Sequence, residues 1–191
     1  MKRIVAICGY KGSGKDFLGN FLAETYGYNK LSFAGNLKEG VRVMFDLTKE
    51  HVDGDLKDVV LEDYGITPRQ ILQHFGTEVA QYQLAQLPGS TTGRNIWARN
   101  LVNKIMGDSR TNFVITDMRF QHEYRELKDA FGSSFISVRV ERDSVLKTDS
   151  HVSEKDFNDI PVDITVKNNR DENYAFEQLR SFFDLIHGFS R

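Results

Sequence analysis

Apolar positions along the chain follow two periods, and stretches of the two kinds alternate. The continuous apolar run over residues 4–8 ends at Gly9 and is typical of a central parallel strand buried on both faces. After a glycine-rich turn, apolar residues recur with helical spacing over residues 17–22, and this stripe stops at Gly27. A strand that leads through a glycine turn into a helix indicates an α/β fold.

Further short apolar runs predict strands, and helical stretches separate them. The predicted strands cover residues 30–33, 113–117, 135–140 and 162–166. Helical spacing covers residues 37–45, 67–75, 96–106 and 176–186. Thr67 is expected to cap the second of these helices and Gly76 to end it. The acidic stretch 50–63 predicts a loop that could contain a short helix, and residues 88–93 form a hinge or lid candidate.

The composition favours one soluble domain and limits the classes of partner. The chain has 191 residues, 40% of them hydrophobic, and 25 Lys and Arg against 27 Asp and Glu give a formal net charge of -2. This near balance provides no overall basic field for a nucleic acid polymer or a membrane surface. The single cysteine, Cys8, excludes an internal disulfide, and no apolar run approaches the length of a membrane span. We expect a cytoplasmic, unprocessed protein.

The strongest motif lies between the first predicted strand and the first predicted helix. Residues 9–15 (GYKGSGK) fit the G-x-x-x-x-G-K pattern of a phosphate-binding loop, in the strand-to-helix context that the pattern requires. Its glycines let backbone N–H groups converge on phosphate oxygens, and Lys15 supplies a positive charge for the β- and γ-phosphates. The alternative, a glycine-rich turn without a ligand, leaves the spacing and the lysine unexplained.

Two carboxylates are candidates for the metal-binding part of such a site. Asp16 stands where Ser or Thr coordinates magnesium in other phosphate loops, so it is expected to act on magnesium through water or to orient the second substrate. A plain helix-start aspartate is the alternative. Asp117 ends a predicted strand, where parallel sheets bind ligands, and Arg119 and Glu123 follow it. A surface set of ion pairs is the alternative there.

Basic residues in the middle of the chain are candidates for binding a second, anionic substrate. Lys38 and Arg42 lie one turn apart on one predicted helix, and Arg69 and Gln73 have the same spacing on another. They could line one anion pocket, because the planar fork of arginine suits phosphate. Solvated helix faces are the alternative. Trp97, the single tryptophan, could stack on a nucleobase or fill the core.

A second basic group follows the fourth predicted strand. Arg139, Arg142 and Lys147 precede the segment 149–154 (DSHVSE), and such a region could close over a triphosphate. His151 has no second His or Cys at a metal-ligand spacing, so we interpret it as a lid or loop residue and not a metal ligand.

Taken in order, these features resemble the deoxynucleoside monophosphate kinases of bacteriophages, within the superfamily of phosphate-loop nucleoside monophosphate kinases. The matching stretches are residues 9–16, 34–38 (AGNLK), 69–78 (RQILQHFGTE), Trp97, 115–123 (ITDMRFQHE), 149–154 and 163–168. The phosphate loop alone is common among kinases, whereas the other stretches are more restrictive. Phe17 departs from the Thr that often follows this aspartate in the phage enzymes, which removes a hydroxyl that could reach the α-phosphate.

The resemblance implies a phosphate-loop NTPase fold of the α/β class, with a five-stranded parallel sheet in the order 2-3-1-4-5 flanked by helices. In this single kinase domain the core would comprise residues 1–33, 107–139 and 161–191. A helical acceptor-binding lobe would cover residues 34–106, and a small lid residues 140–160.

The resemblance also implies ligands and residue roles. ATP and Mg²⁺ are the implied cofactors, and the loop residues that would bind ATP are Lys11, Gly12, Ser13, Gly14, Lys15 and Asp16. The residues that would contact the deoxynucleotide are Lys38, Arg69, Gly76, Thr77, Trp97, Asp117, Arg119 and Glu123. Magnesium would be held, through water, by Asp16 and Asp117. The catalytic set would be Lys15, Asp16, Asp117, Arg119 and Arg142.

The implied reaction is transfer of the ATP γ-phosphoryl group to a deoxynucleoside monophosphate, which gives a diphosphate and ADP in deoxynucleotide biosynthesis. The partners would be small molecules, in the host cytoplasm if the protein is phage-encoded, and a homodimer is left open. Residues 14–17 (GKDF) also resemble animal-type phosphomevalonate kinases, which are the alternative. A nucleotide-dependent regulatory or assembly module is a third hypothesis, and the arginines spread through the lobe speak against it.

Overall fold

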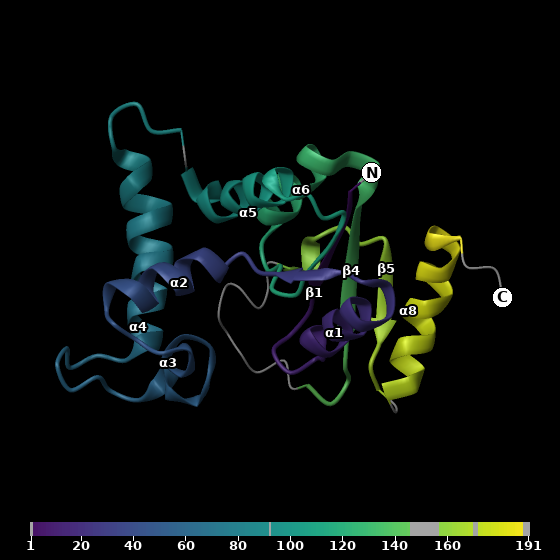
Figure 1. Ribbon diagram of the computed structural model, residues 1–191, viewed down its shortest axis with the longest axis horizontal. Coiled ribbons are helices and arrows are strands. Elements are labelled where there is room, and N and C mark those ends of the chain that lie inside the picture. Colours follow the sequence, from purple (N-terminus) through teal and green to yellow (C-terminus); the bar gives the residue numbers. More distant parts are fainter. Residues whose placement is uncertain (1, 92, 146–156, 170–171, 189–191) are drawn as a thin grey trace. The chain divides into compact units, whose positions relative to one another are not determined.

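A computed structural model describes residues 2–91, 93–145, 157–169 and 172–188 of the chain (Figure 1). Its strands are β1 (Arg3–Cys8), β2 (Asn29–Leu31), β3 (Asn112–Ile115), β4 (Phe135–Glu141) and β5 (Ile164–Lys167). They form one sheet in the order β2-β3-β1-β4-β5, and every neighbouring pair is parallel. The predicted α/β class and the strand order implied by the resemblance are confirmed.

The chain divides into two compact units, one of residues 1–32 and 102–191 and one of residues 33–101. The first, the sheet unit, contains all five strands and the helices α1 (Lys15–Tyr26), α6 (Gln121–Phe131) and α8 (Glu172–His187), with 3₁₀ turns η5 (Gly132–Ser134) and η6 (Phe157–Asp159). The second, the helical unit, contains α2 (Gly35–Met44), α3 (Lys49–Asp53), η1 (Asp55–Asp58), α4 (Pro68–Gln73), η2 (His74–Gln83), η3 (Leu84–Gln86) and η4 (Gly93–Asn95). Helix α5 (Ile96–Gly107) begins in the helical unit and ends in the sheet unit.

β1 lies in the centre of the sheet, between β3 and β4. Ile4 pairs in register with Phe113 of β3 and Phe135 of β4. Residues 4–8 are buried with no exposed surface. This explains why the run is apolar throughout, because both faces of a central parallel strand are covered.

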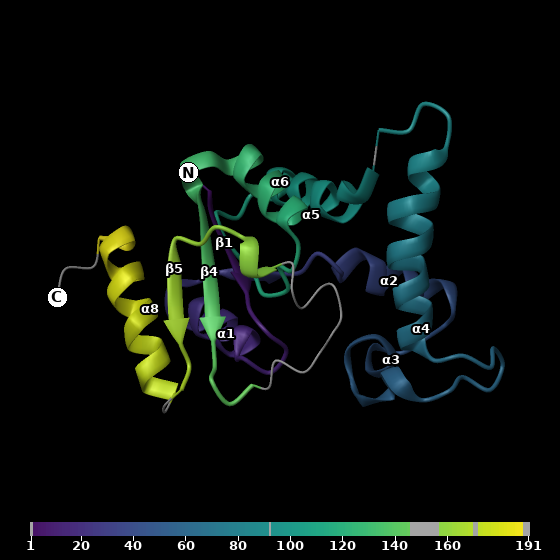
Figure 2. The same cartoon turned by 180° about the vertical axis from the view of Figure 1, so that it is seen from behind.

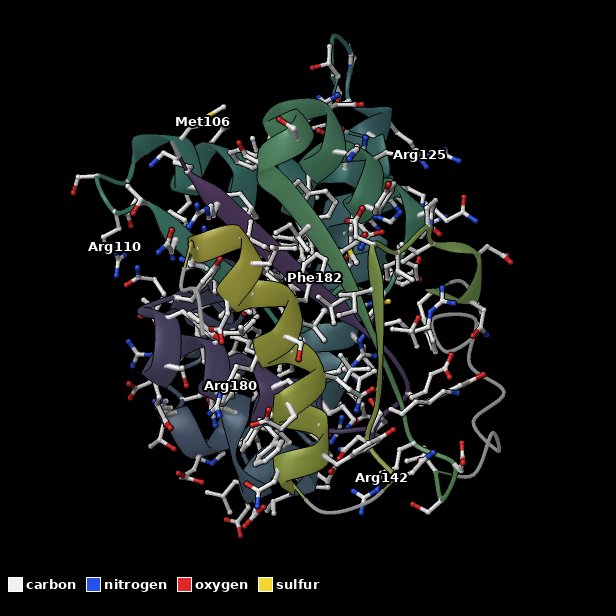
Figure 3. All side chains as sticks on the ribbon, turned by 90° about the vertical axis from the view of Figure 1, so that its right-hand side faces the viewer. Met106, Arg110, Arg125, Arg142, Arg180 and Phe182 are labelled. Atoms are coloured by element: carbon white, nitrogen blue, oxygen red, sulfur yellow. The ribbon has the colours of Figure 1, made fainter. Side chains whose placement is uncertain are left out.

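Helices α1 and α8 cover one face of the sheet. Val5 of β1 and Leu18 of α1 belong to one apolar cluster with Phe183 of α8, and the rings of Phe21 and Phe176 stack with centroids 4.2 Å apart. Figure 3 looks onto α8, in yellow, with Arg180 and Phe182 labelled along it, and Figure 2 shows it beside β5. The stripe of apolar residues in each helix therefore packs against the strands in one apolar cluster on this face of the sheet.

Helix α6 packs against the opposite face. Successive strand residues point to opposite sides, so Phe135 lies across β4 from the residues that face α8. Its ring contacts Tyr124 of α6 with centroids 5.5 Å apart, and Leu127 of the same helix is fully buried. The sheet is thus covered on both faces, which leaves its edges and strand ends for a site.

One sequence expectation in the helical unit needs correction. Thr67 caps α4 as expected, because its hydroxyl accepts from the N–H of Gln70. Gly76 does not end that helix, which continues as the π-helix η2 to Gln83. A Cβ at Gly76 would lie 2.6 Å from Cδ2 of Leu37, so the glycine serves close packing. The acidic stretch 50–63, predicted as a loop that could contain a short helix, includes most of α3 and the 3₁₀ turn η1, and its last five residues lie outside helices.

Candidate functional site

The phosphate-loop motif occupies the turn between β1 and α1, at the carboxyl edge of the sheet, where open parallel sheets bind ligands. Gly9, Gly12 and Gly14 have φ angles of 145°, 81° and 103°, which other residues rarely adopt. A Cβ at Gly14 would also lie 2.4 Å from the side-chain nitrogen of Asn168. The backbone of this loop therefore requires the glycines of the motif.

Two side chains donate hydrogen bonds to the backbone of this loop, one from the end of the loop itself and one from just beyond β5. Nζ of Lys15 donates hydrogen bonds of 2.7 Å to the carbonyl oxygens of Gly9 and Tyr10. The side-chain amide of Asn168 donates to the carbonyl oxygen of Ser13 at 2.8 Å. The hydroxyl of Ser13 is buried and has no partner in the described part of the chain. Sequence reasoning gave Asn168 no role, although its place just beyond a predicted strand was a usable signal.

Asp16 lies in the first turn of α1, where the helix dipole favours a negative charge, and its side chain is 79% exposed. Its Oδ1 accepts a hydrogen bond of 2.7 Å from the hydroxyl of Thr116, which directly follows β3. Nζ of Lys30, in β2, is 3.7 Å from the same oxygen. Neither partner was among the predicted site residues.

The turn after β3 carries Asp117, which is half-buried, and Arg119, which is exposed. A buried carboxylate holds its backbone: Oε2 of Glu123 accepts from the N–H groups of Arg119 at 2.8 Å and of Phe120 at 3.1 Å. Burial raises the pKa of Glu123 to about 8. Glu123 therefore supports the turn, and its predicted contact with a nucleotide stays a prediction.

In the helical unit, two predicted phosphate-binding cations form ion pairs with one short segment. Nζ of Lys38 donates to Oδ1 of Asp53 at 2.6 Å. The guanidinium of Arg69 donates to both carboxylate oxygens of Asp58, at 2.5 and 2.9 Å. Both carboxylates come from the neighbouring helices α3 and η1, so the structure brings Lys38 and Arg69 to the same segment.

The other members of the predicted anion pocket are not brought together in this way. Arg42 pairs with Glu39 of its own helix at 2.6 Å. Gln73 is exposed at the end of α4. Their inclusion with Lys38 and Arg69 in one pocket stays a prediction.

Trp97 contacts the π-helix that contains two further predicted residues. Its Nε1 donates to the carbonyl oxygen of Gly76 at 2.8 Å, and its side chain is half-buried. Thr77, the next residue of η2, is exposed. The structure thus links Trp97 to Gly76 within the helical unit, and their contact with a nucleotide stays a prediction.

The predicted lid lies largely outside the described residues, and Lys147 and His151 are among the undescribed ones. Arg142 is exposed beyond the end of β4 (Figure 3). Arg139 has a different role from the predicted one, because its guanidinium donates to three backbone carbonyl oxygens, those of Phe157, Asn158 and Ile160, at 2.8–3.1 Å. These hydrogen bonds hold the segment 157–160, which precedes β5, against β4.

The described helices contain none that is long and apolar enough to cross a membrane.

The fold and the loop first define a class of protein. The chain is similar to a sugar kinase from Janibacter sp. HTCC2649, with a TM-score of 0.52 and 14% identity over 100% of this chain and 99% of that chain. It is also similar to the dephospho-CoA kinase from Campylobacter jejuni, with a TM-score of 0.51 and 15% identity over 100% of both chains. At this identity the likeness shows the fold, which is that of the phosphate-loop kinases.

The sequence comparisons narrow this class to a family. Residues 46–179 match the model of the deoxynucleotide monophosphate kinases. A protein of Acanthamoeba polyphaga mimivirus that is named after the same family is 29% identical, and the match covers 95% of this chain and 96% of that protein. The chain belongs to the deoxynucleotide monophosphate kinase family and is an ATP-dependent phosphotransferase. The family match begins beyond the phosphate loop, so the loop is separate evidence. The phosphomevalonate alternative is not favoured.

Proposed function

We propose that the protein transfers the γ-phosphoryl group of ATP to the 5′-phosphate of a deoxynucleoside monophosphate and forms a deoxynucleoside diphosphate and ADP. The observation that carries the proposal is the phosphate loop with Lys15 between β1 and α1, in a chain of this kinase family. Phosphoryl transfer depends on positioning and on neutralising charge, with little covalent chemistry for the protein.

In this proposal the sheet unit binds ATP. Backbone N–H groups of residues 11–14 and the ammonium of Lys15 bind the β- and γ-phosphates. Nζ of Lys15 is held at the loop by hydrogen bonds to two neutral carbonyl oxygens. When ATP binds, charged phosphate oxygens would replace these acceptors. Arg119 and Arg142 would stabilise the negative charge of the transferring group.

The donor set fits magnesium bound partly through water. Among the described residues, no three His, Cys, Asp or Glu side chains form a metal-binding group. Magnesium commonly binds one or two carboxylates together with substrate phosphates and keeps several waters. Asp16 and Asp117 would hold it, and the bound ion would neutralise charge between the β- and γ-phosphates.

The helical unit contributes the residues proposed to bind the acceptor. Lys38 and Arg69 would bind its 5′-phosphate in place of Asp53 and Asp58. Ion pairs of such exposure contribute about 0–1 kcal/mol, so a phosphate dianion can displace these carboxylates. Gly76, Thr77 and Trp97 would contact the sugar or base, and the roles of Asp117, Arg119 and Glu123 in acceptor binding belong to the same proposal.

We also propose a setting for this reaction. The enzyme would act in the cytoplasm in deoxynucleotide biosynthesis, with small molecules as its partners. A bacteriophage source, and with it a host cytoplasm, is part of this proposal, and the sequence leaves a homodimer open.

An assay of ADP release over all deoxy- and ribonucleoside monophosphates tests the proposal, with phosphomevalonate included as the rival acceptor. We expect magnesium-dependent turnover of at least one deoxynucleotide and none of phosphomevalonate. Turnover of phosphomevalonate without any deoxynucleotide turnover would reject the proposed function.

A further inference from the structure

Thr116 is a buried residue whose hydroxyl reaches the first turn of α1. Only 6% of its surface is exposed, whereas the side chain of its partner Asp16 is 79% exposed. The bond of 2.7 Å from its Oγ1 to Oδ1 of Asp16 joins residues 100 positions apart in the chain. A buried side chain therefore anchors a carboxylate that would otherwise rotate in solvent.

Gly19, three residues after Asp16 in α1, allows this approach. A Cβ there would lie 2.3 Å from Cγ2 of Thr116 and 3.7 Å from Cε of Lys30. Glycine inside a helix costs roughly 0.5–1 kcal/mol relative to alanine, so a packing reason is expected at such a position. The methyl group of Thr116 occupies the space over Gly19. Because a β-branched side chain is stiff at χ1, this packing fixes the direction of the hydroxyl.

Both contacts of Asp16 use the same carboxylate oxygen. Thr116 donates to Oδ1, and Nζ of Lys30 lies near that oxygen while it donates to Asn20 at 2.7 Å. Within the described part of the chain, Oδ2 of Asp16 has no hydrogen-bond or ion-pair partner. Anchoring Oδ1 therefore leaves Oδ2 in a fixed direction, where it can accept from a water or a hydroxyl group.

We infer that Thr116 is a positioning residue for Asp16. Where other phosphate loops have a hydroxyl after the lysine, this loop has a carboxylate, and a hydroxyl from the end of a neighbouring strand holds it in place. Thr116 acts through Asp16 and does not itself contact a substrate. The inference rests on the proposed function for the reaction in which Asp16 takes part.

Thr116→Val tests this role, because it removes the hydroxyl and keeps the β-branched shape over Gly19. We expect kcat to fall about 10- to 100-fold, the effect of losing a charge-assisted hydrogen bond, with KM for the deoxynucleotide changed less than about twofold. Thr116→Ser keeps the donor but lacks the methyl group that fixes its direction, so it should recover only part of kcat. The matched control is Thr165→Val at an exposed position of β5, which should match the wild type.

A binding measurement provides a readout that does not depend on turnover. We expect calorimetric titration with a non-hydrolysable ATP analogue to show binding weakened about 3- to 10-fold by Thr116→Val in magnesium and unchanged in EDTA. In an Asp16→Ala background, Thr116→Val should add no further loss, because the two residues act as one unit. Wild-type values for Thr116→Val, or a full additional loss in that background, would overturn the inference.

Two kinds of failure remain distinguishable in these experiments. A wild-type protein that phosphorylates no deoxynucleotide rejects the proposed function, and the analogue titration still tests Thr116. Circular dichroism and thermal unfolding show whether Thr116→Val folds. If it does not, Thr116→Ala, which removes the same hydroxyl and is smaller, is used in place of Thr116→Val in every comparison.

Discussion

The two compact units hold their candidate residues in different ways. In the sheet unit the candidate side chains are bonded to backbone or buried atoms: Lys15 to two carbonyl oxygens, Asp16 to Thr116, and the carboxyl group of Glu123 to two N–H groups. In the helical unit Lys38 and Arg69 are bonded to exposed carboxylates. The first arrangement holds these side chains on the backbone or on a buried residue before a ligand arrives, and in the proposed function Lys15 exchanges only neutral carbonyl acceptors for phosphate oxygens. In the second, each cation must exchange a charged carboxylate partner for the phosphate.

This difference has a kinetic consequence. Groups with a fixed geometry can stabilise charge that develops in the transition state, so their loss should lower kcat. Groups that exchange a carboxylate for a phosphate contribute binding energy to ground state and transition state alike, so their loss should raise KM. Substitutions in the two units should therefore differ in whether they change kcat or KM.

Lys15→Ala should lower kcat/KM by roughly three powers of ten or more, because it removes the charge at the transferring phosphate. Its thermal unfolding should stay close to that of the wild type, since the side chain is braced on the loop and contributes little to the core. Lys128→Ala on the exposed surface of α6 is the control. A Lys15→Ala variant with more than a tenth of the wild-type rate would contradict the assignment of the loop.

The fold of the sheet unit was predictable because its signals are local. An apolar run, a glycine loop and a helical stripe follow one another within residues 4–22, and their order implies βα units. The residues that hold the candidate site in place, Thr116 and Asn168, were not predictable in this way. Thr116 contacts Asp16 of α1, 100 positions away, and Asn168 contacts Ser13 of the loop, 155 positions away, and no local pattern links either pair.

The helical unit was less predictable for a related reason. Glycine often ends a helix, but Gly76 lies inside one because Leu37 and Trp97 approach its backbone. The counter-ions Asp53 and Asp58 lie in a stretch whose weak periodicity predicted a loop that could contain a short helix, and no local pattern indicated these ion pairs. Tertiary contacts decided both outcomes, and the predicted nucleotide contacts in this unit remain predictions.

Glu123 gives the sheet unit a predictable dependence of stability on pH. Its pKa in the folded protein is about 8, against 4.5 ordinarily, because of burial. The folded state therefore keeps a proton that the unfolded state loses, so its contribution to stability falls as the pH rises from about 5 to 8. The free energy of unfolding of the wild type should therefore fall between about pH 5 and 8, and in Glu123→Gln this fall should be smaller by roughly 2 to 4 kcal/mol. Denaturant unfolding across that pH range measures both.

The matched control for this experiment is Glu39→Gln in the helical unit. Glu39 is exposed, and its hydrogen bond with Arg42 holds the pKa of its carboxyl below the ordinary value. Its removal should leave the pH profile between 5 and 8 almost unchanged. An unaltered profile for Glu123→Gln would show that the carboxylate is charged when buried, and that the turn after β3 is held differently from our description.

Arg69→Ala should raise KM about 10- to 100-fold for every deoxynucleoside monophosphate alike, because all of them share the 5′-phosphate. Saturating rates should change less than about threefold. Arg69→Lys should recover only part of the affinity, since it lacks the planar fork. Arg180→Ala in α8 is the control, because Arg180 forms a similar exposed pair with Glu177 at 2.9 Å. A fall in kcat as large as the rise in KM would contradict the proposed difference between the units.

Trp97→Phe should have the smallest effect, and it should differ from one base to another. The substitution removes the donor to the carbonyl oxygen of Gly76 and keeps an aromatic ring, so KM values should rise about 3- to 10-fold at most. Loss of a phosphate contact weakens the binding of all acceptors equally, whereas the effect of lost stacking depends on the size of the base. The ratio of variant to wild-type KM over the four deoxynucleotides therefore separates Trp97 from Arg69.

Fluorescence gives the same distinction without turnover, because Trp97 is the only tryptophan of the chain. We expect a saturable change in its emission with deoxynucleoside monophosphates and none with phosphomevalonate. In Arg69→Ala the midpoint should move to higher concentration with its full amplitude retained, since the indole remains in place. Emission that responds to inorganic phosphate as strongly as to a nucleotide would mean that Trp97 reports charge binding, and its assignment to the base or sugar would be wrong.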